Sequence, residues 1–350
     1  MPDLEYTILP VRKRVIKVTI SNGQSTATAN PHVQEIKITH SYLLSLLGVS
    51  IDPYAVPLNT IFYDPQANAQ AYSWYEQFDG TYHRWFVKTP SINANSTYTL
   101  YMIIDTMQQL VDGNIAGINA IYGQNYLGLS YGQLDNGKNV FLLYDNFAGT
   151  TLSSIWNTFG SGSITVNNGL TISVPSGKSN TGIFTSLSSV PSTGVVVRTW
   201  AIARSAGSSG GNDYILFFGN NVTTSGIGSA NGYLPSWWGY GNTKDSIFMA
   251  SSGSGAVLAQ VSDSVILNKL FYGYFMWYYT NQSNLYSYET DTNVALSASD
   301  TTYNLSAISQ FSHFVWIPGS GTSTYTTYTV AIYDAPPSGV MPAIVLSLID

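Results

Sequence analysis

The sequence predicts an all-β protein made of two antiparallel β-sandwiches in tandem. Short runs of β-branched and aromatic residues recur along the chain, separated by Gly, Pro, Asn and Asp, which is the pattern of strands and turns. The composition combines 26 Tyr, 14 Phe and 8 Trp with few charges, as in many β-rich secreted or assembled proteins. A length of 350 residues suits two domains with ordinary hydrophobic cores.

The chain opens with two extended segments, residues 11–20 and 32–40, joined by a linker rich in turn formers. This arrangement predicts a hairpin-like opening. Four of the 13 basic residues lie in the first segment: Arg12, Lys13, Arg14 and Lys17. Their alternation with Val and Ile favours an edge strand guarded by positive charge over a phosphate-binding site. Contact with an acidic neighbour in an assembly is a third interpretation.

The next elements complete a first sandwich. Residues 42–51 form an apolar run too short to distinguish a helix from a buried strand. Between residues 59 and 104, four strand-like runs alternate with turn formers, as in an antiparallel sandwich. Residues 105–138 look like an insertion whose apolar positions permit one short helix before a loop rich in Gly and Tyr. Whether residues 1–54 pack on this sandwich or on a neighbouring molecule stays open.

The second sandwich begins within residues 142–156, where Phe147, Leu152 and Trp156 supply apolar anchors among residues that favour turns. We therefore place the domains at residues 1–138 and 139–350. Nine later runs fit strands of this module. One of them, FYGYFMWYY at residues 271–279, has aromatic residues on both faces, which predicts a strand buried on two sides or facing another subunit.

Four blocks of the first module resemble, in order, an uncharacterised β domain that is widespread in archaeal and bacterial surface proteins. The matching blocks are Phe62 to Asp64, Tyr72 to Glu76, Trp85 to Ser91, and Asn95 to Tyr101. The chain departs from that family after the last strand, at Met102 to Asp105.

Residues 140–156 resemble the opening of the concanavalin A-like lectin/glucanase module that often follows this domain. Together the two resemblances cover most of residues 55–335. They imply jelly-roll or concanavalin-like sandwiches, a surface location and frequent association with glycans. They do not imply a catalytic activity.

Composition limits the class of protein. Charged residues make up 9% of the chain, against roughly 25% in typical soluble domains. Because there are only 19 carboxylates, acid causes little self-repulsion, which suits an acidic extracellular medium. A net charge of −6 argues against nucleic-acid binding. The absence of cysteine excludes disulfides and thiolate metal sites, and neither a signal peptide nor a membrane span is predicted.

Catalytic groups are sparse. Glycosidases need two carboxylic acids across a cleft, and the second module offers only one glutamate, Glu289, with Asp291 two residues on. We interpret this pair as a strand end and predict a protein that is not an enzyme. The four histidines, His32, His40, His83 and His313, show no spacing typical of a zinc site. Neither a metal nor a cofactor is expected.

Aromatic residues are the strongest candidates for binding. Residues 233–240 are bounded by Gly and Pro and are predicted to form a loop, in which exposed rings can stack on sugars. The candidates for glycan binding are Tyr233, Trp237, Trp238 and Tyr240. A lid over the sandwich or a subunit interface is the more common use of such rings. Four sequons give the glycosylation candidates of a possible glycoprotein: Asn95, Asn221, Asn281 and Asn304.

These features favour a structural and adhesive protein that is not an enzyme. Because no signal peptide is predicted, the preferred hypothesis is a virion protein, either a capsid component or a surface-exposed attachment protein, from an archaeal virus of a hot, acidic habitat. Such a protein would be thermostable, would contact itself and other structural proteins, and could meet host glycans at the virion surface. The first alternative is a secreted or cell-surface glycan-binding protein. The second is a degenerate glycoside hydrolase.

Overall fold

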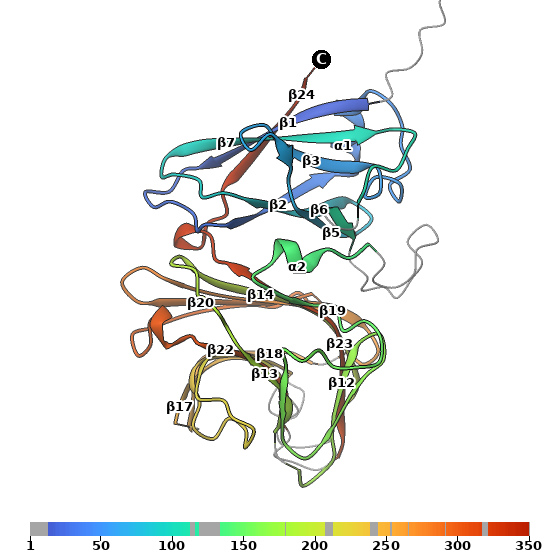
Figure 1. The fold of residues 1–350 in the computed structure, drawn as a ribbon. Coiled ribbons are helices and arrows are strands. Elements are labelled where there is room, and N and C mark those ends of the chain that lie inside the picture. Colours follow the sequence, from blue (N-terminus) through green and yellow to red (C-terminus); the bar gives the residue numbers. More distant parts are fainter. Residues whose placement is uncertain are drawn as a thin grey trace, which may run out of the picture. The chain divides into compact units, whose positions relative to one another are not determined.

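The computed structural model describes most of the chain and confirms the predicted fold class. The described residues are 13–112, 116–118, 134–178, 180–206, 213–238, 244–252, 254–264, 266–290, 292–316 and 321–349. The chain divides into two compact units (Figure 1), the N-terminal unit of residues 1–27, 31–140 and 341–350 and the C-terminal unit of residues 28–30 and 141–340. The last ten residues therefore belong with the N-terminal unit, although the predicted boundary assigned them to the second sandwich.

The N-terminal unit is a sandwich of two sheets, ordered β24-β1-β7-β3-β4 and β2-β6-β5-β8. Its strands are antiparallel except for the β5–β8 pair. Figure 1 shows β1, β7 and β3 in one layer and β2, β6 and β5 in the other. The elements are β1 Lys13–Asn22, β2 His32–Thr39, α1 His40–Leu47, β3 Thr60–Asp64, β4 Ala69–Gln70, β5 Ser73–Phe78, β6 Tyr82–Thr89, β7 Ser96–Asp105, β8 Ala116–Ile118, α2 Gly137–Val140 and β24 Ala343–Ile349.

Two predictions for the N-terminus are wrong. β1 and β2 lie in different sheets, so the opening is not a hairpin. β1 is also not an edge strand, because it pairs with β7 on one side and with β24 on the other. Of the described basic side chains, Lys13 and Lys17 are exposed and Arg14 is half-buried, while Ile16, Val18 and Ile20 point into the core. Residues 13–27 and 31–47 therefore pack within the N-terminal unit.

Helix α1 settles the ambiguous run at residues 42–51. The Thr39 hydroxyl accepts a hydrogen bond from the backbone N–H of Tyr42 at 3.1 Å and caps the first turn. Gly48, with φ of +66°, ends the helix in the left-handed region. Leu43 and Leu47 are buried in the core of the unit. In the insertion, the described residues 116–118 form a strand, and most of the predicted helix lies outside the described residues.

The C-terminal unit is a larger sandwich of a seven-stranded sheet, β10-β13-β22-β15-β16-β17-β18, and an eight-stranded sheet, β11-β12-β23-β14-β19-β20-β21. β9 joins the second sheet by pairing with β23. The elements are β9 Leu143–Asp145, β10 Asn157–Phe159, β11 Ser163–Val166, β12 Leu170–Val174, β13 Thr181–Ser186, β14 Gly194–Ser205, β15 Asp213–Asn220, β16 Asn231–Trp238, β17 Lys244–Ser251, β18 Ser254–Ser262, β19 Leu270–Tyr279, β20 Ser283–Glu289, β21 Ala295–Asp300, η2 Leu305–Ala307, β22 Gln310–Trp316, β23 Ser323–Asp334 and η3 Pro337–Gly339.

The predicted start of this sandwich is organised by Asp145. Its Oδ1 accepts the backbone N–H of Phe147 at 2.7 Å, and its Oδ2 accepts the indole N–H of Trp156 at 2.7 Å. Phe147 and Trp156 are buried in the main core of the unit. Leu152, the third predicted anchor, is partly buried against this core. The three anchors are therefore confirmed, and one carboxylate fixes Phe147 and Trp156.

Candidate functional site

The predicted aromatic loop does not exist as such. Residues 231–238 form strand β16, and the side chains of Tyr233 and Trp237 are 0% and 1% exposed. Tyr233 donates its hydroxyl to Asp300 Oδ1 at 2.5 Å, and the Trp237 indole donates to Ser287 Oγ at 3.1 Å. These two residues build the core and cannot stack on a glycan. The side chain of Trp238 and the whole of Tyr240 lie outside the described residues.

The structure instead presents tyrosines on the outer face of strands β19 and β20. Along β19, Phe271, Phe275 and Trp277 enter the core, whereas Tyr272 and Tyr274 point the other way and stay half-buried. Strand β20 alternates in the same sense, so that its outer positions include Tyr286 and Tyr288. Of the two alternatives predicted for residues 271–279, burial on both faces does not fit the half-buried Tyr272 and Tyr274, and contact with another subunit stays a prediction. We call Tyr272, Tyr274, Tyr286 and Tyr288 the tyrosine face.

The four rings form a contiguous set. Tyr272 lies 5.8 Å from Tyr288 and Tyr274 lies 5.9 Å from Tyr286, measured between ring centroids. The guanidinium of Arg198, from the adjacent strand β14, lies 4.7 Å from the centroid of Tyr272 and 5.7 Å from that of Tyr274. Cation–π contacts of this length hold the rings in place. Burial, with the neighbouring Tyr272 as the second cause, raises the pKa of Tyr286, so its hydroxyl stays protonated and can donate a hydrogen bond.

Small residues flank the tyrosine face. Strand β21 pairs with β20 and sets Ala295 opposite Tyr288 and Ser297 opposite Tyr286. Ala295, Ser297 and Ser299 are exposed. A ligand lying on the tyrosines would therefore meet short side chains at the edge of the sheet, with room for its substituents. The sequence signal for this site was the alternation of Tyr with core residues in two neighbouring strands. Because aromatic residues occur at both core and outer positions of these strands, the sequence alone did not separate the two faces.

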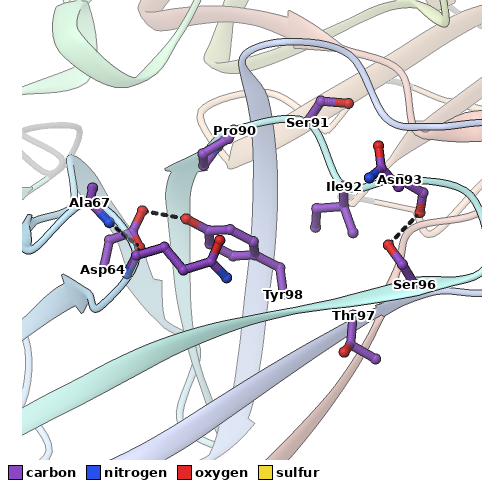
Figure 2. A pocket seen from close by; sticks show the side chains of 10 residues that line it. Asp64, Ala67, Pro90, Ser91, Ile92, Asn93, Ser96, Thr97 and Tyr98 are labelled. Carbon is purple, nitrogen blue, oxygen red and sulfur yellow. Dashed lines mark hydrogen bonds between the residues drawn. The ribbon is translucent and has the colours of Figure 1, made fainter.

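A polar pocket of about 380 Å³ lies in the N-terminal unit (Figure 2). At one end, Asp64 accepts the hydroxyl of Tyr98 and the backbone N–H groups of Gln66 at 2.9 Å and Ala67 at 3.2 Å. Burial, helped by the bond to Asp64, raises the pKa of Tyr98. This carboxylate is engaged in closing its own turn. A ligand would therefore meet the short polar side chains of Ser91, Asn93, Ser96 and Thr97 together with the apolar Pro90 and Ile92.

The structure brings together two histidines that are far apart in the sequence. His40 Nδ1 lies 3.0 Å from His83 Nε2, and His83 Nδ1 lies 3.0 Å from the hydroxyl of Tyr75. Burial, and next the neighbouring His40, lowers the pKa of His83 to about 3, although Asp79 opposes the shift. His83 is therefore neutral at pH 7, and the group forms an interior hydrogen-bonded chain in the N-terminal unit.

The four sequon asparagines lie outside the strands and helices of the structure. Asn95, Asn221, Asn281 and Asn304 are all exposed. Asn304 also caps η2, since its side chain accepts the backbone N–H of Ser306 at 3.0 Å. Of the acidic pair considered for catalysis, Glu289 is 0% exposed, and Asp291 lies outside the described residues.

Comparison with known proteins gives one relative in sequence. The chain is 31% identical over 162 residues to uncharacterized protein 562 of Sulfolobus islandicus rod-shaped virus 1. The match covers 45% of this chain and 25% of the relative, so the chain spans about a quarter of the relative's length. No family model matches, and the resemblance of residues 55–335 to the uncharacterised β domain and its lectin/glucanase partner is not confirmed.

Solved structures of similar fold include carbohydrate-binding module CBM66 from Bacillus subtilis, with a TM-score of 0.38 and 16% identity over 51% of this chain and 96% of that chain. The exoplasmic/lumenal domain of VIP36 matches with a TM-score of 0.39 and 14% identity over 57% of this chain and 94% of that chain. These scores are too low to indicate what the chain binds. Among the described residues, no helix has both the length and the apolar character that crossing a membrane demands.

Proposed function

We propose that the protein is a structural and adhesive protein of a virus particle, that it is not an enzyme, and that its C-terminal unit binds glycans through the tyrosine face. The observation that carries the glycan proposal is the set of four half-buried tyrosines on β19 and β20, held by Arg198. The similarity to a protein of a rod-shaped virus supports the viral assignment.

The chemistry of the tyrosine face suits sugars. Aromatic rings offer apolar faces to the C–H surfaces of a pyranose, and their hydroxyl groups hydrogen-bond to sugar hydroxyls. The exposed Ser297 and Ser299 add short polar groups beside the rings without blocking approach. A neutral, hydroxyl-rich ligand fits such a face better than an anion does. The one cation among these residues, Arg198, is buried beside the ring of Tyr272 and is therefore not exposed to a ligand.

A glycan array with the full-length protein tests the binding proposal. We expect selective binding that falls about tenfold or more in Tyr286→Ser plus Tyr288→Ser, since losing two stacking rings removes at least ~1.4 kcal/mol. Tyr54→Ser is the matched control, because Tyr54 is 56% exposed and lies in the N-terminal unit. A blank array for the unaltered protein, or equal loss in the control, would overturn the glycan proposal.

Light scattering tests the structural half separately. A virion component is expected to form regular assemblies or to join particles, whereas a secreted lectin stays a small oligomer. Purified protein that remains monomeric at acid and neutral pH while binding glycans would favour the alternative of a secreted or cell-surface adhesin. Release of reducing sugar from a bound glycan would favour the glycoside hydrolase instead.

A further inference from the structure

Three carboxylates from three separate strands meet inside the C-terminal unit. Asp245 lies at the start of β17, Asp263 directly follows β18, and Glu289 ends β20. One oxygen from each lies within 4.8 Å of the others. All three residues are buried, with exposed fractions of 1%, 8% and 0%. The histidine spacing that argued against a metal site could not reveal this cluster, because its members are carboxylates far apart in the chain.

Strand pairing explains the meeting. Asp245 is the register partner of Val261, which places Asp263 at the same end of the β17–β18 pair. Glu289 follows the inward-facing Leu285 and Ser287 of β20, in the opposite sheet. The turn after β20 fixes the glutamate, since the hydroxyl of Thr292 and the backbone N–H of Val294, at 3.3 Å, donate to its Oε1. The cluster therefore spans the two sheets of the sandwich.

Asp263 supplies an independent sign that this cluster binds a ligand. Its Oδ2 is buried and has no hydrogen-bond partner among the residues that the structure describes. A buried carboxylate oxygen without a partner costs free energy, and a second and third carboxylate beside it add like-charge repulsion. Burial, together with the charge of Asp263, raises the pKa of Glu289, although the hydrogen bonds from Thr292 and Val294 oppose the shift. A cation at this place would remove both costs.

We propose that Asp245, Asp263 and Glu289 bind a calcium ion that joins the two sheets of the C-terminal unit. A set made only of carboxylate oxygens selects a hard divalent cation. Calcium binds oxygen at about 2.4 Å, so ligand oxygens on opposite sides of the ion are about 4.8 Å apart. The spacing of the three oxygens stays within that limit. This proposal is independent of the tyrosine face, which lies on the outside of the same eight-stranded sheet.

The test uses full-length protein that has been treated with a chelator and then titrated with CaCl₂ at pH 7 by calorimetry. We expect one ion per chain and a rise in melting temperature of a few degrees at saturation. Asp263→Asn and Glu289→Gln should each weaken binding at least tenfold. Asp79→Asn is the matched control, because it removes one charge from an exposed turn of the N-terminal unit. Trp237 packs against Gly273, the register partner of Glu289, so terbium luminescence excited through this indole reports the same site.

If calcium binds weakly, the melting temperature of Asp263→Asn provides a second test. In the absence of metal this variant should melt above the unaltered protein, since it relieves repulsion, and it should lose the calcium-dependent rise. Absence of binding by Ca²⁺, Mg²⁺ and Mn²⁺, or binding unchanged in Asp263→Asn, would overturn the proposal. Sugar-releasing activity lost in Glu289→Gln would assign the carboxylates to hydrolysis and overturn it as well.

Discussion

Arg84 shows how a single buried cation holds one sheet of the N-terminal unit. Its Nε lies 2.9 Å from Glu35 and its Nη1 lies 2.8 Å from Glu76. We expect Arg84→Met to lower the free energy of unfolding by about 3–5 kcal/mol, because it leaves two carboxylates without their guanidinium. Glu35→Gln should cost about 1 kcal/mol, since the side chain of Glu35 is 22% exposed and the pair is partly solvated. Urea denaturation measures both, and equal losses would contradict this account.

Gly273 is required by the indole that packs on it. A Cβ added at this residue would lie 2.7 Å from Cη2 of Trp237, a contact that forces the ring or the strand to move. We expect Gly273→Ala to destabilise the C-terminal unit by about 1–3 kcal/mol, the usual cost of overpacking a core. Gly255→Ala is the control, because its Cβ would meet Phe248 at an ordinary 3.8 Å. Thermal melts of both variants decide the point, and a neutral Gly273→Ala would refute the packing argument.

The prediction for Tyr233 and Trp237 was wrong for a local reason. The sequence predicts a loop for Tyr233 and Trp237 because Pro235 lies between them and Gly232 and Gly239 bound the segment. The paired register of β15 and β16 skips Leu234 and Pro235, and at such an interruption a proline can stand within a strand. The anchors Phe147 and Trp156 were predictable because their burial depends on Asp145, which is near in the sequence.

Among the elements, β24 is the one whose removal we expect to affect stability most. It returns the chain to the N-terminal unit after the whole C-terminal unit. It pairs with β1 over seven residues, from Val15 with Ile349 to Ser21 with Ala343. We expect removal of residues 341–350 to lower the melting temperature of the N-terminal unit and to leave that of the C-terminal unit unchanged. β1 would then be an open edge, which promotes aggregation. Calorimetry resolves the two transitions, and Val345→Ser, at a residue 63% exposed, is the control.

The same element explains why the assignment of β1 failed. Its basic residues resemble the charges that protect an edge, yet its partners are β7 and β24, the latter more than 300 residues away in the chain. Periodicity gives the type of an element and the face that it buries, whereas the choice of partner depends on the whole topology. The carboxylate cluster depends on the topology in the same way, because Glu289 lies in the opposite sheet from Asp245 and Asp263. The tyrosine face is built on the consecutive strands β19 and β20 and takes only Arg198 from a distant strand.

At the scale of the whole molecule, response to acid depends on buried groups more than on surface charge. The few carboxylates predict little repulsion in acid, but two interior histidines oppose that tolerance. Burial lowers the pKa of His313 to about 3, and that of His83 is also lowered to about 3. In the unfolded chain both titrate near pH 6.5. Below pH 6.5 the unfolded chain therefore binds protons that the folded protein does not. The free energy of unfolding is highest above pH 6.5 and falls progressively as the pH drops toward 3.

This linkage yields a double-difference experiment. Between pH 6.5 and 5, each buried histidine should cost the folded protein about 2 kcal/mol, from about 1.4 kcal/mol per pH unit. His313→Gln removes the proton-binding group from the core of the C-terminal unit, so we expect it to lower stability at pH 7 and to reduce the loss between pH 7 and pH 5. His83→Gln should reduce the loss by a similar amount in the N-terminal unit. Urea denaturation at the two pH values measures these differences. If both variants keep the full acid sensitivity of the unaltered protein, the buried imidazoles do not set it, and the surface carboxylates and the Asp245, Asp263 and Glu289 cluster become the groups to vary next.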